Sequence, residues 1–254
     1  MTDFRGVKAV VFDLDDTLAP SKSAMDPRMS AALAALLERV SVAIISGGRF
    51  EQFEAQALAN LQGDEAALSR LHLMPTCGTR YYTRENAEWV LQYAEDLTDD
   101  EKQRTMAVLE EGARSLGFWA PGEWGPLIED RGSQITFSAL GQQAPLDAKE
   151  HWDPDFAKRK IIQADLRTRL PGMSINMGGA TSIDITREGV DKAYGLKKLR
   201  DASGIPLDAM MFIGDAIFPG GNDYPAKELG LDTVRVRDPE ETLSVIAAIV
   251  ACQK

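Results

Sequence analysis

The stretch Val7-Lys8-Ala9-Val10-Val11-Phe12-Asp13-Leu14-Asp15-Asp16-Thr17-Leu18 decides the fold predicted for this chain. Its apolar part, residues 9–12, is rich in β-branched and aromatic side chains. That composition is typical of a short, fully buried strand. In open α/β sheets, ligands bind beyond the carboxyl ends of the strands, so Asp13 and Asp15 are expected at a binding site.

Three carboxylates lie within four positions of this stretch, at residues 13, 15 and 16. Like charges this close repel one another unless a cation neutralises them. A hard divalent ion such as Mg²⁺ binds a few carboxylates together with a phosphate, and the end of a buried strand suits it. The same residues would also suit an acidic turn that caps the next helix through Asp16 and Thr17, and this segment alone leaves both interpretations open.

The composition is that of an ordinary soluble globular protein with one large domain or two modest ones. The 254 residues are 44% hydrophobic and 26% charged, and the net charge is −11. A negative charge of this size repels nucleic acid and anionic membranes, so we expect neither as a partner. An anionic substrate then requires a local group of cations or a metal.

Two features favour a cytoplasmic location. The chain has two cysteines, Cys77 and Cys252, which form no disulfide framework and suit a reducing compartment. The early apolar run is interrupted by Asp13 and Asp15, unlike a signal peptide, and no apolar segment approaches the roughly 20 residues that span a bilayer.

The order of strand and helix patterns predicts two domains. Residues 82–187 combine hairpin and helix patterns, including a hairpin over 81–93 and a helix from about 153 to 170, which indicates an inserted α+β domain. The flanking segments, residues 1–81 and 188–254, show the βαβ pattern of a parallel α/β sheet. The buried strands predicted in these flanking segments are residues 9–12, 42–45, 72–74, 210–213 and 234–236.

Polar residues follow several of these predicted strands. Ser46-Gly47-Gly48 precedes a helix pattern over residues 50–61, an arrangement that can cradle a phosphate on backbone N–H groups. Alone this signal is weak, because such turns are common in purely structural roles. Lys192 opens a later helix, and Asp215 and Asp223 flank a loop rich in glycine after the strand at 210–213.

Together these residues resemble the four motifs of the haloacid dehalogenase-like phosphohydrolases. The first motif, Asp-x-Asp-x-Thr, is present as residues 13–17; Ser46 matches the second, Lys192 the third, and the pair Asp215 and Asp223 the fourth. The resemblance implies an α/β Rossmannoid core with a parallel sheet. It also implies that the insertion is a cap domain of the α+β type known as C2B, which determines substrate specificity.

The resemblance implies a role for each motif residue in phosphoryl transfer. Asp13 is expected to be the nucleophile that forms an aspartyl-phosphate, and Asp15 the general acid and then the base that activates water. Thr17 is expected to fix the motif loop, while Ser46 and Lys192 neutralise the phosphoryl oxygens. The expected Mg²⁺ ligands are Asp13, Asp15 through its carbonyl oxygen, Asp215 and Asp223.

Within this superfamily, the chain resembles the phosphomannomutase family across both predicted domains. The resemblance is carried by residues 13–22, 178–184, 188–192 and 214–223. It also implies a homodimer formed through the cap. The substrate-binding residues that it implies are Gly47, Lys22, Arg131, Gln142, Lys149, Ser182 and Asp184.

Three departures from the family pattern bear on the activity. Lys22, Gln142 and Lys149 stand where the pattern has arginines, and neither lysine nor glutamine forms the bidentate phosphate contact of an arginine. A mutase must hold a sugar bisphosphate in two orientations, so these exchanges favour hydrolysis.

The leading hypothesis is a Mg²⁺-dependent phosphatase acting on a small phosphorylated metabolite, specifically a sugar phosphate. A hexose phosphomutase is the alternative, and a catalytically silent binding module is the third. Asp16, which replaces the usual glycine of the first motif, has no explanation from the sequence.

Overall fold

The structure, a computed structural model, describes residues 4–253. The chain divides into two compact units. One unit comprises the chain up to Ala94 together with the chain from Asp191 onward, and the other comprises Glu95–Val190. Each unit has its own hydrophobic core and its own sheet.

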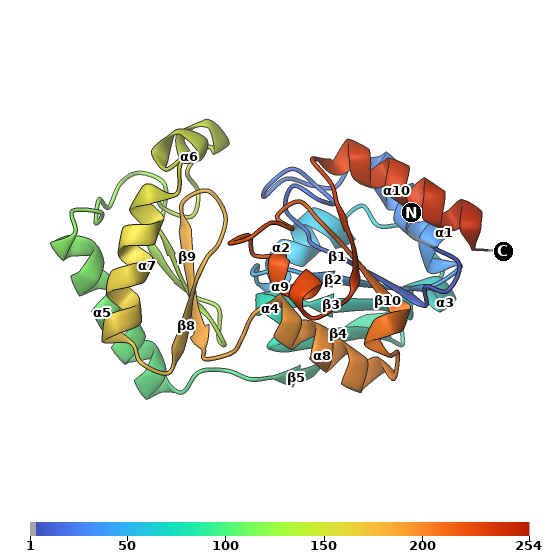
Figure 1. The fold of residues 1–254 in the computed structure, drawn as a ribbon, viewed down its shortest axis with the longest axis horizontal. Coiled ribbons are helices and arrows are strands. Elements are labelled where there is room, and N and C mark those ends of the chain that lie inside the picture. The colour runs from blue at the N-terminus through green and yellow to red at the C-terminus, as the bar shows by residue number, and fades with distance from the viewer. Residues whose placement is uncertain (1–3, 254) are drawn as a thin grey trace. The chain divides into compact units, whose positions relative to one another are not determined.

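The first unit contains a seven-stranded sheet in the order β11-β10-β1-β2-β3-β4-β5 (Figure 1). The five strands from β11 to β3 are parallel to one another, and β4 and β5 continue the sheet as an antiparallel hairpin. The predicted α/β fold with a mostly parallel sheet is therefore confirmed. The strands are β1 (Ala9–Phe12), β2 (Ser41–Ile45), β3 (Leu71–Met74), β4 (Arg80–Glu85), β5 (Glu88–Ala94), β10 (Met210–Gly214) and β11 (Asp232–Arg235).

Side chains of the central strand β1 alternate between two helical layers. Val10 and Phe12 pack into a cluster with α1 and α10, whereas Ala9 and Val11 pack into a cluster with α8 and α9. Figure 1 shows α1 beside α10 on one face of the sheet and α8 on the other. The helices are α1 (Pro27–Leu37), α2 (Phe50–Phe53) with the π-helical turn η1 (Glu54–Leu58), α3 (Glu65–Leu68), α4 (Pro75–Gly78), α8 (Lys192–Ser203), the 3₁₀ turn η2 (Leu207–Ala209), α9 (Tyr224–Glu228) and α10 (Pro239–Cys252).

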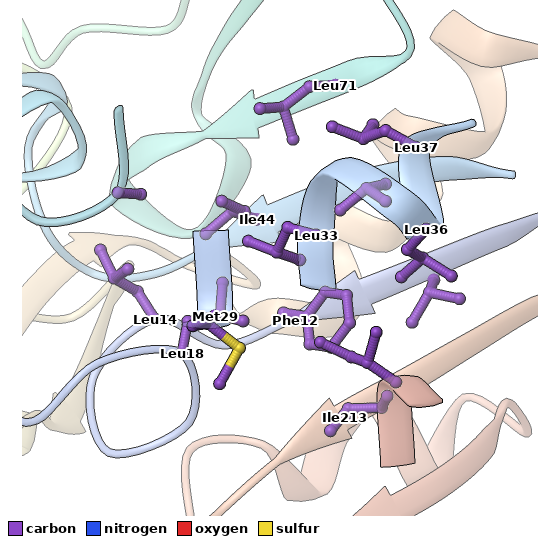
Figure 2. Packing of buried hydrophobic residues seen from close by; sticks show 14 of the residues in the cluster. Phe12, Leu14, Leu18, Met29, Leu33, Leu36, Leu37, Ile44, Leu71 and Ile213 are labelled. Atoms are coloured by element: carbon purple, nitrogen blue, oxygen red, sulfur yellow. The ribbon is translucent and has the colours of Figure 1, made fainter. Parts of the chain in front are cut away.

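The larger of these two clusters fixes the strand that carries the first motif. Phe12 lies at its centre with Leu33 of α1, Ile44 of β2 and Ile213 of β10 (Figure 2). Because residues 9–12 of β1 are buried on both faces, the strand reads as a continuous apolar run rather than as an alternating one. Asp13 follows directly after this run, at the carboxyl edge of the sheet.

The second unit is an α+β unit with an antiparallel sheet in the order β6-β7-β9-β8. One face of this sheet is apolar: Phe137, Ile175 and Ile185 are buried in one cluster with Leu109 and Ile162 of the helices. The strands are β6 (Ile128–Asp130), β7 (Ile135–Ser138), β8 (Met173–Met177) and β9 (Ser182–Arg187), and the helices are α5 (Asp99–Ser115), α6 (Leu146–Trp152) and α7 (Ala157–Arg169).

Two sequence predictions need correction. The hairpin of β4 and β5 belongs to the central sheet, since β4 pairs with β3, so the first unit extends to Ala94 rather than to residue 81. Likewise, α7 begins at Ala157 rather than at Asp153. The Asp153 carboxylate accepts from the backbone N–H groups of Lys158 and Arg159, so it caps the helix from further upstream than predicted.

In the part of the chain that the structure describes, no helix has both the length and the apolar character needed to cross a membrane.

His72 on β3 gives the first unit a predictable pH dependence. Its Nδ1 lies 2.8 Å from Tyr81 Oη, and burial lowers the pKa of its imidazole to about 4. Because the unfolded chain binds this proton near pH 6.5, stability is fully present above that pH and falls as pH drops towards 4. We expect this group to remove about 1 kcal/mol of unfolding free energy between pH 7 and pH 5.5.

Urea denaturation of the His72→Asn variant at both pH values checks this prediction. The variant should lose less stability on acidification than the wild type does. His151, the other histidine, is exposed, and Asp147 raises the pKa of its imidazole, so the matched control His151→Gln should lose at least as much stability on acidification as the wild type. Equal acid sensitivity in all three proteins would contradict the assignment to His72.

Candidate active site

Three carboxylates and one ammonium group meet at the carboxyl edge of the central sheet. Asp13 follows β1, Asp215 follows β10, Asp223 ends the loop after β10, and Lys192 begins α8. Lys192 Nζ lies 2.7 Å from Asp13 Oδ1 and also contacts Asp223 Oδ1. Sequence prediction had assigned all four residues to one site, and the first unit brings them together.

Three of these four residues are almost inaccessible to solvent, and Asp215 is partly buried. Asp13 is 4% exposed, Lys192 1% and Asp223 0%. Burial alone would lower the pKa of the Lys192 ammonium, but the Asp13 and Asp223 carboxylates raise it above its usual value. Lys192 therefore stays charged, and it compensates one of the buried carboxylates.

Burial has the opposite effect on the carboxyl groups, because it raises their pKa values. Burial raises the pKa of Asp13 well above its usual range, against the lowering effect of Lys192, and Asp223 and Asp215 raise it further. Burial, with Asp223 nearby, raises the pKa of Asp215 to about 6. When all three carboxyl groups are ionised, the one ammonium group leaves two negative charges uncompensated, which is the charge that a divalent cation would balance.

The donor atoms also suit such a cation. Asp13, Asp215 and Asp223 can each offer one carboxylate oxygen, and these oxygens lie within 4.8 Å of one another. All are hard oxygen donors, the type that Mg²⁺ prefers. The two oxygens of Asp223 already have partners in the chain, because Oδ1 contacts Lys192 and Oδ2 accepts from the Ala216 N–H at 3.0 Å. Asp223 therefore fixes both Lys192 and the backbone that follows Asp215.

The remaining motif residues of the first unit lie on the loops beside this cluster. Ser46 follows β2, the strand next to β1, and its Oγ accepts from the Gly48 N–H at 3.1 Å. Thr17 is fully buried, and within residues 4–253 its hydroxyl has no hydrogen-bond partner. The Lys22 backbone N–H donates to Asp15 Oδ1 at 2.8 Å, which ties the far end of the loop to the motif.

The structure explains Asp16, which the sequence left open. Its φ is 59°, in the left-handed region where glycine is favoured and where aspartate is the more tolerated among other residues. Its carboxylate accepts from the Ser21 N–H at 3.0 Å, and its own N–H donates to the Ala19 carbonyl oxygen. Asp16 therefore closes the motif loop with a side-chain bond that glycine could not make.

Sequence reasoning missed the turn that holds Ser46 and Lys192 in place. Thr76 and Cys77 after β3 both have positive φ, and their N–H groups donate to the carbonyl oxygens of Gly48 and Ser46. A Cβ on Gly195 of α8 would lie 2.6 Å from the Cys77 carbonyl oxygen. The turn thus packs against the first part of α8, close to Lys192. The positions of the glycines in the sequence did not predict this contact.

We expect Gly195→Ala to disturb this packing. The added methyl group meets backbone on one side and Ile45 on the other, and overpacking of this kind costs about 1–3 kcal/mol of unfolding free energy. Gly6→Ala is the matched control, because a Cβ there has no atom within 4 Å. Urea denaturation of the two variants checks the difference, and equal stability would contradict the close packing.

The other predicted substrate residues belong to the second unit. On β9, Ser182 and Asp184 point to the polar face of the sheet; Ser182 Oγ lies 3.1 Å from Ser138 Oγ, and Asp184 Oδ1 accepts from Thr136 Oγ1 at 2.8 Å. Strand register places Glu129, Thr136, Asp184 and Asn176 in one row across the four strands.

The predicted cations of the second unit have acceptors within it. Arg131 donates through Nε to Glu129 Oε2 at 2.7 Å, in a side-chain ion pair. Lys149 Nζ donates to the Gln142 carbonyl oxygen at 3.2 Å, so these two predicted residues lie together. In the second unit, Ser182 and Asp184 thus lie on one sheet face, while Lys149 and Gln142 contact each other.

Comparisons with known proteins agree with this motif set. The chain is 29% identical to phosphomannomutase 1 of Mus musculus over 224 residues, covering 84% of this chain and 80% of that one. It is 26% identical to the phosphomannomutase of Spinacia oleracea over 255 residues, covering 96% of each.

Solved structures with the same fold are more distant in sequence. A haloacid dehalogenase-like hydrolase from Bacteroides thetaiotaomicron has a TM-score of 0.62 at 18% identity, covering 96% of this chain and 99% of that one. The IMP-nucleotidase of Plasmodium falciparum, truncated at its N-terminus, has a TM-score of 0.69 at 16% identity, covering 97% and 68%.

The family comparison includes both units. The sequence model described as eukaryotic phosphomannomutase matches residues 29–252, which takes in Ser46, Lys192, Asp215 and Asp223. With these motif residues gathered as described and the relatives similar over most of their length, the chain belongs to the eukaryotic phosphomannomutase family, on a haloacid dehalogenase-like fold.

Proposed function

We propose that this protein is a Mg²⁺-dependent phosphatase that hydrolyses a small phosphorylated metabolite, a sugar phosphate, through an aspartyl-phosphate on Asp13. The observation that carries the proposal is the buried contact of Asp13 with Lys192, at a strand end where Asp215 and Asp223 complete a cation-binding group. Family membership supports a substrate that is a phosphate ester of a sugar.

The residues of the first unit divide the chemistry between them. Asp13 attacks phosphorus, and Lys192 holds the attacking carboxylate in place and offsets phosphoryl charge together with Ser46. Asp15 gives a proton to the leaving sugar oxygen and later takes one from the attacking water. Asp13, Asp215 and Asp223, with the Asp15 carbonyl oxygen, would hold Mg²⁺, which would supply charge neutralisation for the transferred group.

A second candidate activity is that of a phosphomannomutase. Family membership favours it, as do Ser182 and Asp184 on the polar face of the second unit's sheet. The pairing of Arg131 with Glu129 favours hydrolysis instead, because this carboxylate competes with a second phosphate for the guanidinium group. Lys22, Gln142 and Lys149 add no bidentate phosphate contact.

A panel of phosphate esters with Mg²⁺ separates these activities. Phosphate release from mannose 6-phosphate or related esters, lost in Asp13→Asn, supports the phosphatase. Conversion of mannose 1-phosphate to the 6-phosphate, stimulated by a hexose bisphosphate, supports the mutase. If neither activity is found across the panel, both proposals fail, and a binding module on the same fold becomes the better explanation.

The free cysteines Cys77 and Cys252 support a cytoplasmic location, where thiols stay reduced. The homodimer through the second unit remains a prediction, and light scattering of the purified protein tests it. The net charge of −11 supports a small-molecule partner rather than nucleic acid.

A further inference from the structure

Asp15 is held by three donors within the first unit. Gln52 Nε2 donates to Asp15 Oδ2 at 3.0 Å, and Gln56 Nε2 donates to Oδ1 at 3.1 Å. The Lys22 N–H also donates to Oδ1. Both oxygens of this carboxylate are therefore fixed by side chains that the motif comparison does not include.

Each of the two glutamine amides also makes a further hydrogen bond within the first unit. Gln52 Nε2 also donates to Gln56 Oε1 at 2.6 Å, and Gln56 Nε2 also donates to the Ser23 carbonyl oxygen at 3.2 Å. Gln56 is 2% exposed, and its backbone carbonyl accepts from the Met25 N–H at 2.7 Å. A buried amide with this many partners has one orientation, so it imposes one orientation on Asp15 as well.

The helical segment that carries these two amides contains an unusual turn. Gln52 lies in α2, and Gln56 lies in the π-helical turn η1 that follows it directly. Single π-helical turns are rare and occur frequently at functional sites, because they redirect side chains within a helix. Here the residues at positions i and i+4 both reach the same carboxylate.

Gly48 is a second, independent sign of this arrangement. A Cβ on Gly48 would lie 2.7 Å from Cδ of Gln52 and closer still to its Oε1, so the absent side chain makes room for the Gln52 amide. Gly48 also belongs to the predicted phosphate cradle. Its lack of a side chain lets Gln52 reach Asp15 as well.

We propose that Gln52 and Gln56 are positioning residues that aim Asp15 during proton transfer. This inference rests on the proposed phosphatase activity. In the first step, Asp13 Oδ forms a bond to phosphorus as the ester P–O bond breaks, and protonated Asp15 gives its proton to the leaving oxygen. In the second step, water attacks the aspartyl-phosphate, Asp15 takes the proton, and Asp13 is released with inorganic phosphate.

The test uses substrates that differ in their need for an acid. The p-nitrophenolate ion leaves readily without a proton, whereas the oxygen of phenyl phosphate, and still more that of mannose 6-phosphate, requires one. The ratio kcat/KM reports the first step alone, since Asp15 acts as a base only after the leaving group has departed. In Gln52→Met and Gln56→Met we expect kcat/KM to fall about 10- to 100-fold with mannose 6-phosphate and phenyl phosphate. With p-nitrophenyl phosphate, kcat/KM should fall no more than about 3-fold.

Two further variants keep the test decisive if either substitution impairs folding. Gly48→Ala should reproduce the Gln52→Met result, because its methyl group displaces the flexible Gln52 amide from Asp15 and leaves both side chains chemically unchanged. Glu51→Ala is the matched control, since Glu51 is an exposed residue of the same helix that pairs with Arg49 at the surface. It should retain wild-type rates with all three substrates.

The outcomes distinguish the positioning role from the proposed function. Equal losses of kcat/KM with all three substrates in the glutamine variants, beside an active wild type, would overturn the positioning role. An unaltered kcat/KM with phenyl phosphate would overturn it too. A wild type that releases phosphate from none of the three esters would instead count against the proposed function itself.

Discussion

The Asp13→Asn variant is expected to lose phosphate release by a factor of about 10⁴ or more, with KM nearly unchanged. Asparagine has the shape of aspartate but is too weak a nucleophile to attack phosphorus. Removal of a nucleophile eliminates the covalent step, and the surrounding charges contribute only residual catalysis. Steady-state kinetics with p-nitrophenyl phosphate and Mg²⁺ measures the loss.

The same variant should fold as well as the wild type does. Lys192 keeps its contact with Asp223, and the substitution removes a buried carboxylate whose pKa burial raises. We therefore expect the unfolding free energy of Asp13→Asn to stay within about 1 kcal/mol of the wild-type value. Retention of more than about a tenth of the wild-type rate in a folded variant would contradict the role of Asp13 as nucleophile.

Lys192→Met is expected to damage both stability and activity. The ammonium group is the shared partner of Asp13 and Asp223, and its removal leaves two carboxylates buried at 4% and 0% exposure without that partner. Breaking a buried ion pair by removing one member costs about 3–5 kcal/mol. Methionine preserves the length of the side chain, so the loss reports charge more than packing.

Urea denaturation of Lys192→Met against Lys197→Met checks this expectation. Lys197 lies on the same helix but is exposed, so its variant should unfold within about 0.5 kcal/mol of the wild type. Phosphatase assays of both variants complete the comparison, and only Lys192→Met should be inactive. A Lys192→Met protein as stable as the control would show that the buried carboxylates do not depend on this lysine.

The two variants together separate catalysis from folding at one site. Asp13→Asn removes a group that the fold tolerates poorly and the proposed chemistry requires. Lys192→Met removes a group that the fold and the proposed chemistry both require. Burying three carboxylates together lowers stability, so a core selected for stability alone would not contain them. Such a cluster is expected where function requires buried charged groups.

The positions of the strands were predictable because each has a local pattern. Residues 9–12 and 210–213 are continuous apolar runs, and the structure has β1 and β10 there. The hairpin at β4 and β5 was predicted as a hairpin, but its attachment to β3 was not, because pairing between strands depends on distant residues. The π-helical turn after α2 had no signal either, since it interrupts a pattern that reads as one helix over 50–61.

The sequence by itself determined which residues form the charged cluster: Asp13 and Asp215 follow apolar runs, whereas Lys192 and Asp223 were identified through the resemblance to the phosphohydrolase motifs. Only the tertiary structure decided how those residues are held. Lys192 reaches Asp13 across 179 positions, and Gln56 reaches Asp15 across 41, distances at which no local periodicity links two side chains. Residues 13–17 thus predicted a nucleophile and an acid, while the folded chain supplied the partners that hold both side chains.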